Sequence, residues 1–146
     1  MRNLNLLLSA VVIILFSTSC KQSNERPNGW YFITSNTTDS LSSKPIVTVT
    51  DFETIKLDSF VTQDHPVQYE IVGKLKAEKS KDFADATEKS IGHPIGFLYN
   101  GKIICSPVPN ARIESGNFSI TPPELYTNKD EMIRIYDDLK KEMEMS

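Results

Sequence analysis

The sequence is poor in the residues from which disulfide and metal sites are built. Its 146 residues include two cysteines and two histidines, too few for a disulfide-dense scaffold or a metal cluster with several side-chain ligands. It also lacks a long basic run, and its 16 Lys and Arg are outnumbered by 19 Asp and Glu. This balance argues against nucleic acid as a partner and against electrostatic attraction to anionic lipid.

Hydrophobic residues are scarce once the N-terminal segment is set aside. They make up 39% of the chain, and a disproportionate share of them lies in residues 1–19. The remainder suits one small domain with a sheet that is buried on one face. It does not suit the doubly covered parallel sheet of an α/β enzyme.

Catalytic motifs are absent as well. The sequence contains no Gly-x-Ser-x-Gly elbow, and its two histidines, His65 and His93, each precede a proline, as is typical of turns and strand entries. Cys105 follows two isoleucines in an expected strand; we interpret it as a small buried residue, with a redox or cross-linking role as the alternative. We therefore predict no enzymatic activity and no cofactor.

The N-terminus has the pattern of an export signal. Residues 6–16 are almost continuously apolar after a basic start, and a helix of this length spans about 17 Å, well below the ~30 Å hydrocarbon core of a membrane. Such a run is typical of a signal peptide. It ends in Ser17-Thr18-Ser19-Cys20, which is similar to the bacterial lipobox, in which the cysteine is lipidated and becomes the first residue of the mature chain.

We therefore expect residues 1–19 to be a lipoprotein signal peptide and Cys20 to carry the lipid that anchors the chain to a membrane of the bacterial envelope. The alternative is an ordinary secretory signal cut near Ser19, because Ser17 stands where the lipobox usually has leucine. Residues 21–24 lack an acidic cluster, which favours a protein that faces the periplasm.

Residues 20–44 are expected to form a tether followed by a loop rich in Ser and Thr. Within this stretch, residues 30–33 are abruptly apolar. We interpret them as a strand packed on its own domain, with an exposed aromatic anchor as the alternative. The folded domain is predicted to cover residues 45–146.

Alternating and helical patterns indicate the order of elements in that domain. Strands are expected at 46–50, 54–60, 67–75 and 117–121, and helices at 76–91 and after a cap at Thr127 or Asn128. Two apolar runs, 95–99 and 102–105, flank Asn100-Gly101, the strongest local signal for a hairpin. This order predicts an α+β fold with a mostly antiparallel sheet and two helices packed on one face.

The segment 106–116 is the candidate partner-contacting surface. Its prolines remove backbone donors and favour an extended loop away from the sheet, and its polar side chains alternate with small or apolar ones. The candidate residues are Pro107, Pro109, Asn110, Arg112 and Glu114. The alternative is a simple crossover whose Ile113 fills the core.

Several of these features occur in a recognisable series from about Gln68 onward. A strand enters a helix that stops near Gly92, and a second strand, 95–99, follows. The series then continues with Asn100-Gly101-Lys102-Ile103-Ile104, Cys105-Ser106-Pro107-Val108, Ile113, Gly116 and Ile120. It resembles the head subdomain of the first periplasmic domain (P1) of SecD/SecDF, the accessory subunit of the Sec protein-export channel.

The resemblance implies a ferredoxin-like α+β fold and contacts with exported proteins or the Sec machinery. The chain carries no transmembrane helices after its signal, so the proton-coupled pulling of SecDF is not expected. We therefore predict a non-enzymatic, lipid-anchored periplasmic binding domain. The alternative is a structural or regulatory lipoprotein of another envelope complex that uses the same fold.

Overall fold

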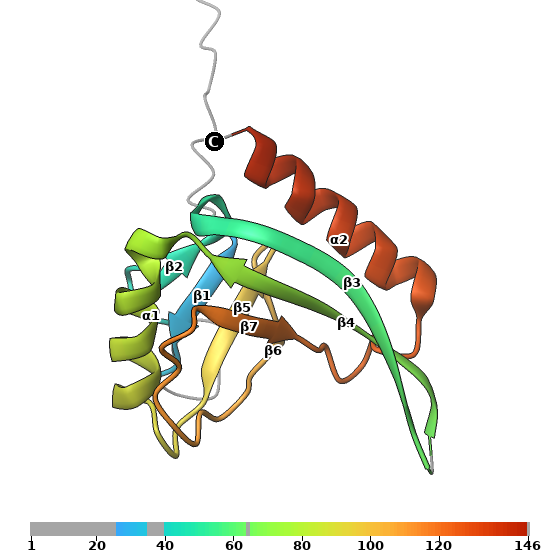
Figure 1. The fold of residues 1–146 in the computed structure, drawn as a ribbon, viewed down its shortest axis with the longest axis horizontal. Coiled ribbons are helices and arrows are strands. Elements are labelled where there is room, and N and C mark those ends of the chain that lie inside the picture. Colours follow the sequence, from blue (N-terminus) through green and yellow to red (C-terminus); the bar gives the residue numbers. More distant parts are fainter. Residues whose placement is uncertain (1–25, 35–39, 64, 146) are drawn as a thin grey trace, which may run out of the picture.

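The computed structural model describes residues 26–34, 40–63 and 65–145 (Figure 1). Its elements, in chain order, are β1 (Gly29–Phe32), β2 (Val47–Thr48), a 3₁₀ turn (Val49–Asp51), β3 (Phe52–Thr62), β4 (His65–Leu75), α1 (Ala77–Lys89), β5 (Ile95–Tyr99), β6 (Lys102–Cys105), β7 (Asn117–Ile120) and α2 (Lys129–Glu144). The chain is therefore an α+β protein, as the sequence predicted. Of the helices in the described ranges, none combines the length and apolar character needed to span a membrane.

The strands form two antiparallel sheets rather than one. A four-stranded sheet has the order β2-β1-β5-β6, and a three-stranded sheet has the order β3-β4-β7. Helix α2 packs on β3 and β4, whereas α1 contacts β2. The expected single sheet with two helices on one face is therefore corrected to two sheets. Helix α2 also reaches the four-stranded sheet, because the Tyr99 hydroxyl of β5 donates to the Asp138 carboxylate of α2 at 2.6 Å.

The chain passes from the first sheet to the second within the predicted strand 46–50. Only Val47–Thr48 is extended, because the carboxylate of Asp51 accepts a hydrogen bond from the Thr48 amide at 2.8 Å and the chain turns there in a 3₁₀ turn. After this turn the chain leaves the first sheet. It then begins β3 in the second sheet.

The centre of the core is Trp30, a residue of β1 that is 1% exposed. Its ring packs near the rings of Phe97 (5.1 Å between centroids), Phe118 (6.3 Å) and Phe83 (6.4 Å). These three residues belong to β5, β7 and α1, so one aromatic cluster joins both sheets and a helix. The packed-strand interpretation of residues 30–33 is confirmed, and the exposed aromatic anchor is excluded.

The folded part begins before the predicted boundary at Pro45. Strand β1 lies between β2 and β5, so residues assigned to the tether from their position in the sequence are part of the sheet. Just before β1, the Asn28 side chain donates to the Glu142 carboxylate of α2 and accepts from the Asn100 amide, both at 2.7 Å. Asn28 therefore joins the start of β1 to the end of α2 and to the β5–β6 turn.

The local signals for the hairpin and the last helix are confirmed. Asn100 (φ 47°) and Gly101 (φ 77°) both have positive φ, as a type I′ turn requires. The Asn128 side chain accepts a hydrogen bond from the Glu131 amide at 3.2 Å and caps α2. The buried stripe of α2 contains Met132, Ile135 and Leu139.

The longest strands give the molecule its outline. Beyond the region covered by α2 and β7, the ends of β3 and β4 project as a two-stranded arm (Figure 1). Val61 and Val67 on this arm are 71% and 43% exposed. Nearer the body, β4 lies between β3 and β7, and the outer face of these three strands is open.

Candidate functional site: a groove on the three-stranded sheet

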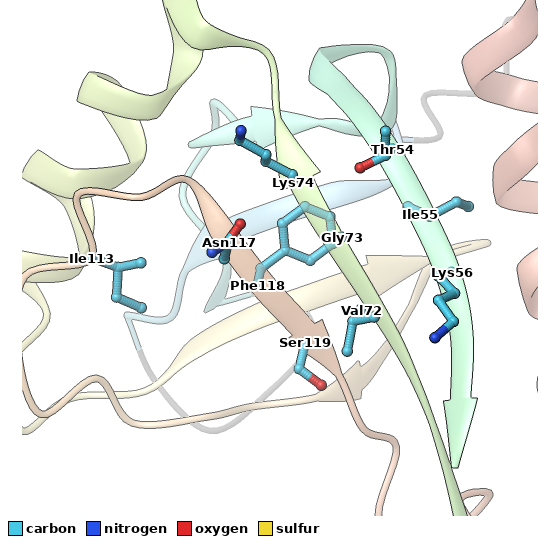
Figure 2. A pocket seen from close by; sticks show the side chains of 10 residues that line it. All are labelled: Thr54, Ile55, Lys56, Val72, Gly73, Lys74, Ile113, Asn117, Phe118 and Ser119. Carbon is cyan, nitrogen blue, oxygen red and sulfur yellow. The ribbon is translucent and has the colours of Figure 1, made fainter.

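The outer face of the β3-β4-β7 sheet carries an open groove of about 690 Å³ (Figure 2). Side chains alternate between the two faces of a strand, and the core takes Ile71 and Leu75 of β4 and Ile120 of β7. The intervening residues, among them Val72 and Ser119, therefore face outward. They form the middle of the groove.

The strand register arranges the outward side chains in three rows. Thr54 lies opposite Lys74, which lies opposite Asn117. In the next row, Lys56 lies opposite Val72, which lies opposite Ser119. The third row pairs Asp58 with Glu70.

Charge is divided between the two ends of this face. Lys56 and Lys74 are diagonal neighbours at one end, whereas Asp58 and Glu70 occupy the other. The hydroxyl of Ser119 donates to Glu70, so this carboxylate already has a partner within the sheet. The face is therefore cationic over the first two rows and anionic over the third.

The two lysines differ in how far they are neutralised. The Lys56 ammonium lies 3.5 Å from the Asp58 carboxylate, with both side chains largely exposed. Lys74 makes no ion pair within the described ranges. Exposed pairs of this kind contribute little free energy, so both ammonium groups are available to an incoming anion.

The predicted loop 106–116 borders the groove through Ile113. This half-buried side chain contributes to the rim beside Asn117 and contacts the core (Figure 2). Its amide donates to the hydroxyl of Thr87 on α1 at 3.0 Å. Ile113 therefore packs on the core, as the crossover interpretation expects, and also lines the groove; contact of the loop with a partner stays a prediction.

Backbone hydrogen bonds attach the prolines of this loop to the rest of the fold. The carbonyl of Pro107 accepts from the Ile95 amide at 3.0 Å, and that of Pro109 accepts from the Gly92 amide at 3.1 Å. Pro109 is buried, whereas Pro107 and Asn110 are exposed. The loop is thus extended and held at several points.

Arg112 attaches the loop to α1 by charge. Its guanidinium lies 2.7 Å from the Asp85 carboxylate, 2.8 Å from Glu88 and 3.3 Å from Glu114. Hydrogen bonds from Lys81 and Arg112 lower the pKa of Asp85 to about 2. Arg112 therefore makes intramolecular ion pairs, while Asn110 and Glu114 remain exposed beside it.

Cys105 and His93, two residues weighed for chemistry, are a buried strand residue and an exposed turn residue. Cys105 is 6% exposed, and burial raises the pKa of its thiol to about 12, so the reactive thiolate is scarce at neutral pH. His93 is exposed in the turn after α1. No group of three or more His, Cys, Asp or Glu side chains capable of holding a metal occurs in the part of the chain that the structure describes.

Two predicted features lie outside the described residues: the signal peptide at 1–19 and the lipid attachment site at Cys20. Conversely, the structure adds groove residues that the sequence did not single out, above all Lys56, Val72 and Lys74. Alternation along each strand was a usable signal for their orientation. Their proximity depends on the strand register, which no local pattern reveals.

Comparisons with known proteins agree with this fold. A structure of a membrane component, SecDF, that enhances protein export matches with a TM-score of 0.55 and 20% identity, over 69% of this chain and 42% of that one. A structure of SecDF in a super-membrane-facing form gives the same score and identity over 69% of this chain and 13% of the other.

The chain thus spans less than half the length of either SecDF structure. No curated protein sequence gives a match. The family model of the SecDF P1 head subdomain matches residues 30–127, from Trp30 at the centre of the core to the residue before the cap of α2. The chain therefore belongs to the SecDF P1 head subdomain family.

Proposed function

We propose that this protein is a non-enzymatic, lipid-anchored domain that faces the periplasm and contacts exported polypeptides or the Sec machinery. The match to the SecDF P1 head over residues 30–127 is the observation that carries this proposal. The groove on the β3-β4-β7 sheet is the proposed contact surface, because it is open and has an apolar centre between polar side chains.

Membrane attachment is proposed from the sequence. An apolar run, three small residues and Cys20 follow one another at the N-terminus, and the cysteine is the proposed site of lipidation. A lipid on Cys20 would hold the domain at a membrane of the bacterial envelope. No nucleic acid, metal or cofactor enters the proposal.

A different envelope complex is the second candidate partner. The fold of the P1 head does not by itself determine what the domain binds, and the chain spans only part of SecDF. In this alternative the domain is a structural or regulatory lipoprotein. The same groove would then contact one folded partner rather than many exported chains.

Site-specific cross-linking separates the two candidates. A photo-cross-linking amino acid is placed at position 72, in the groove, and, as a control, at position 89, on the exposed end of α1. We expect position 72 to capture Sec components or several exported chains in intact cells, and position 89 to capture far less. Reproducible capture of one unrelated envelope complex from position 72 would contradict the export role.

The loop 106–116 is tested by two substitutions. If the loop contacts the partner, Asn110→Ala should reduce cross-linking from position 72 while the free energy of unfolding stays unchanged. Arg112→Glu should reduce both quantities, because it also places a fourth carboxylate beside Asp85, Glu88 and Glu114. Unchanged cross-linking in both variants would show that the loop is only a connection.

A further inference from the structure

The groove carries two exposed lysines on neighbouring strands, Lys56 on β3 and Lys74 on β4. Lys56 and Lys74 occupy diagonal positions on neighbouring strands, where Cα atoms are about 7–8 Å apart. The two side chains extend in different directions in Figure 2, and the Asp58 carboxylate pairs with Lys56. Because lysine side chains are long and flexible and both residues are exposed, the two ammonium groups can turn towards one anion bound above this part of the sheet.

An apolar surface adjoins the lysine pair. Val72 is the cross-strand neighbour of Lys56, and Ile113 lies on the opposite rim of the groove (Figure 2). Neighbouring strands are about 4.8 Å apart, and alternate side chains of an extended chain are about 6.8 Å apart. Two side chains at positions i and i+2 of an extended segment can therefore reach Val72 and the lysine pair together.

We propose that the groove binds an extended acidic polypeptide segment in which an apolar residue and an Asp or Glu are two positions apart. The apolar side chain packs on Val72, and Lys56 and Lys74 turn towards the carboxylate. The inference rests on the proposed function and names the chemistry of the bound segment.

The charge pattern also fixes the direction of binding. Asp58 and Glu70 lie one row beyond Val72, so a carboxylate placed at that end would face two carboxylates. Like-charge contacts of this kind disfavour the wrong arrangement. The bound acidic residue must therefore lie towards Lys74.

The test uses two synthetic nine-residue peptides with blocked ends. Both have a Ser- and Thr-rich background and a leucine; the first has a glutamate two positions after the leucine, and the second has glutamine there. Each is titrated into the full isotope-labelled chain in a nonionic detergent, and binding is followed by amide chemical shifts. We expect shifts at Val72 and Ser119, with the glutamate peptide binding about fivefold more tightly at low salt.

Lysine variants identify the source of this preference. Lys56→Gln and Lys74→Gln should each reduce the preference for glutamate, and the double variant should abolish it. Lys74→Arg should retain it, and Lys89→Gln, on the exposed end of α1, is the matched control. Val72→Thr should weaken both peptides alike, because it removes apolar contact without changing charge.

The outcomes separate this inference from the proposed function. Equal affinities for the two peptides, with shifts confined to the groove, would overturn the acidic preference and leave the binding role intact. If the preference for glutamate survives in the double lysine variant, the assignment of that preference to Lys56 and Lys74 is overturned as well. An absence of groove shifts with either peptide at millimolar concentration would overturn both the inference and the groove as the contact surface.

Discussion

At the turn between β5 and β6, two consecutive residues have positive φ, and only one of them is glycine. Gly101 has φ 77°, and a Cβ added there would meet no atom within 4 Å. Gly101→Val should therefore destabilise the protein through backbone strain alone, by about 1–3 kcal/mol. Urea unfolding measures this cost, and Gly101→Asn should cost less, because asparagine tolerates positive φ. An unchanged midpoint for the valine variant would contradict the role of the turn.

Asp85 gives the protein a predictable response to acid. Its pKa is lowered to about 2 in the folded state by Lys81 and Arg112, from an ordinary value of 3.8. The ion pairs therefore stabilise the fold fully above pH 4, and this contribution is lost as the pH falls from about 4 towards 2.

Asp85→Asn should consequently lower the free energy of unfolding at pH 6, and the difference from the unmodified protein should shrink as the pH approaches 2. Unfolding by urea at a series of pH values measures this difference in the free energy of unfolding. Asp82→Asn on the same helix is the control. The Asp82 carboxylate is as far as 4.0 Å from the Lys79 ammonium and its side chain is 61% exposed, so this pair contributes little. A difference between Asp85→Asn and the unmodified protein that is independent of pH would contradict the prediction.

Strands β4 and β7 are joined by the stacking of a ring on a glycine. Gly73 lies opposite Phe118, and a Cβ on Gly73 would lie 2.3 Å from the Phe118 ring. Gly73→Ala must therefore displace Phe118, which is 8% exposed, at a cost of about 1–3 kcal/mol. The single tryptophan, Trp30, packs against Phe118, so its fluorescence should change too.

A double variant tests this explanation. Gly73→Ala combined with Phe118→Leu should be less destabilised than the sum of the two single variants, because the shorter side chain removes the clash. Simple additivity would mean that the alanine acts elsewhere.

At the scale of helices and strands, local sequence patterns predict most elements but not how the elements assemble. The Asn100-Gly101 turn and the Asn128 cap depend on neighbouring residues, so the sequence predicts them well. The division into two sheets depends on which strands pair at long range, and the turn at Thr48–Asp51 lies where the chain passes from one sheet to the other. For the same reason, the diagonal placement of Lys56 and Lys74 follows from the strand register and from no local pattern.

For the whole molecule, attachment to the membrane is the feature most open to test. Cys20→Ala should abolish incorporation of labelled palmitate and release the mature protein from the membrane fraction or leave it as precursor. Cys105→Ala is the matched control, since the Cys105 thiol is buried in the core and its loss should leave labelling unchanged. Continued membrane association of a correctly cleaved Cys20→Ala protein would contradict the anchor.

The position of β1 determines how the domain would carry a mechanical load. In the proposed anchored form, a chain pulled while it is held in the groove transmits tension to the lipid through Asn28 and β1. Strand β1 is hydrogen-bonded to both β2 and β5. It can therefore leave the sheet only if its hydrogen bonds to both neighbouring strands break together. Single-molecule pulling between residues 26 and 72 should therefore show one cooperative rupture, and an early extension from β1 detaching alone would contradict it. The domain would thus act as a stiff link between cargo and membrane.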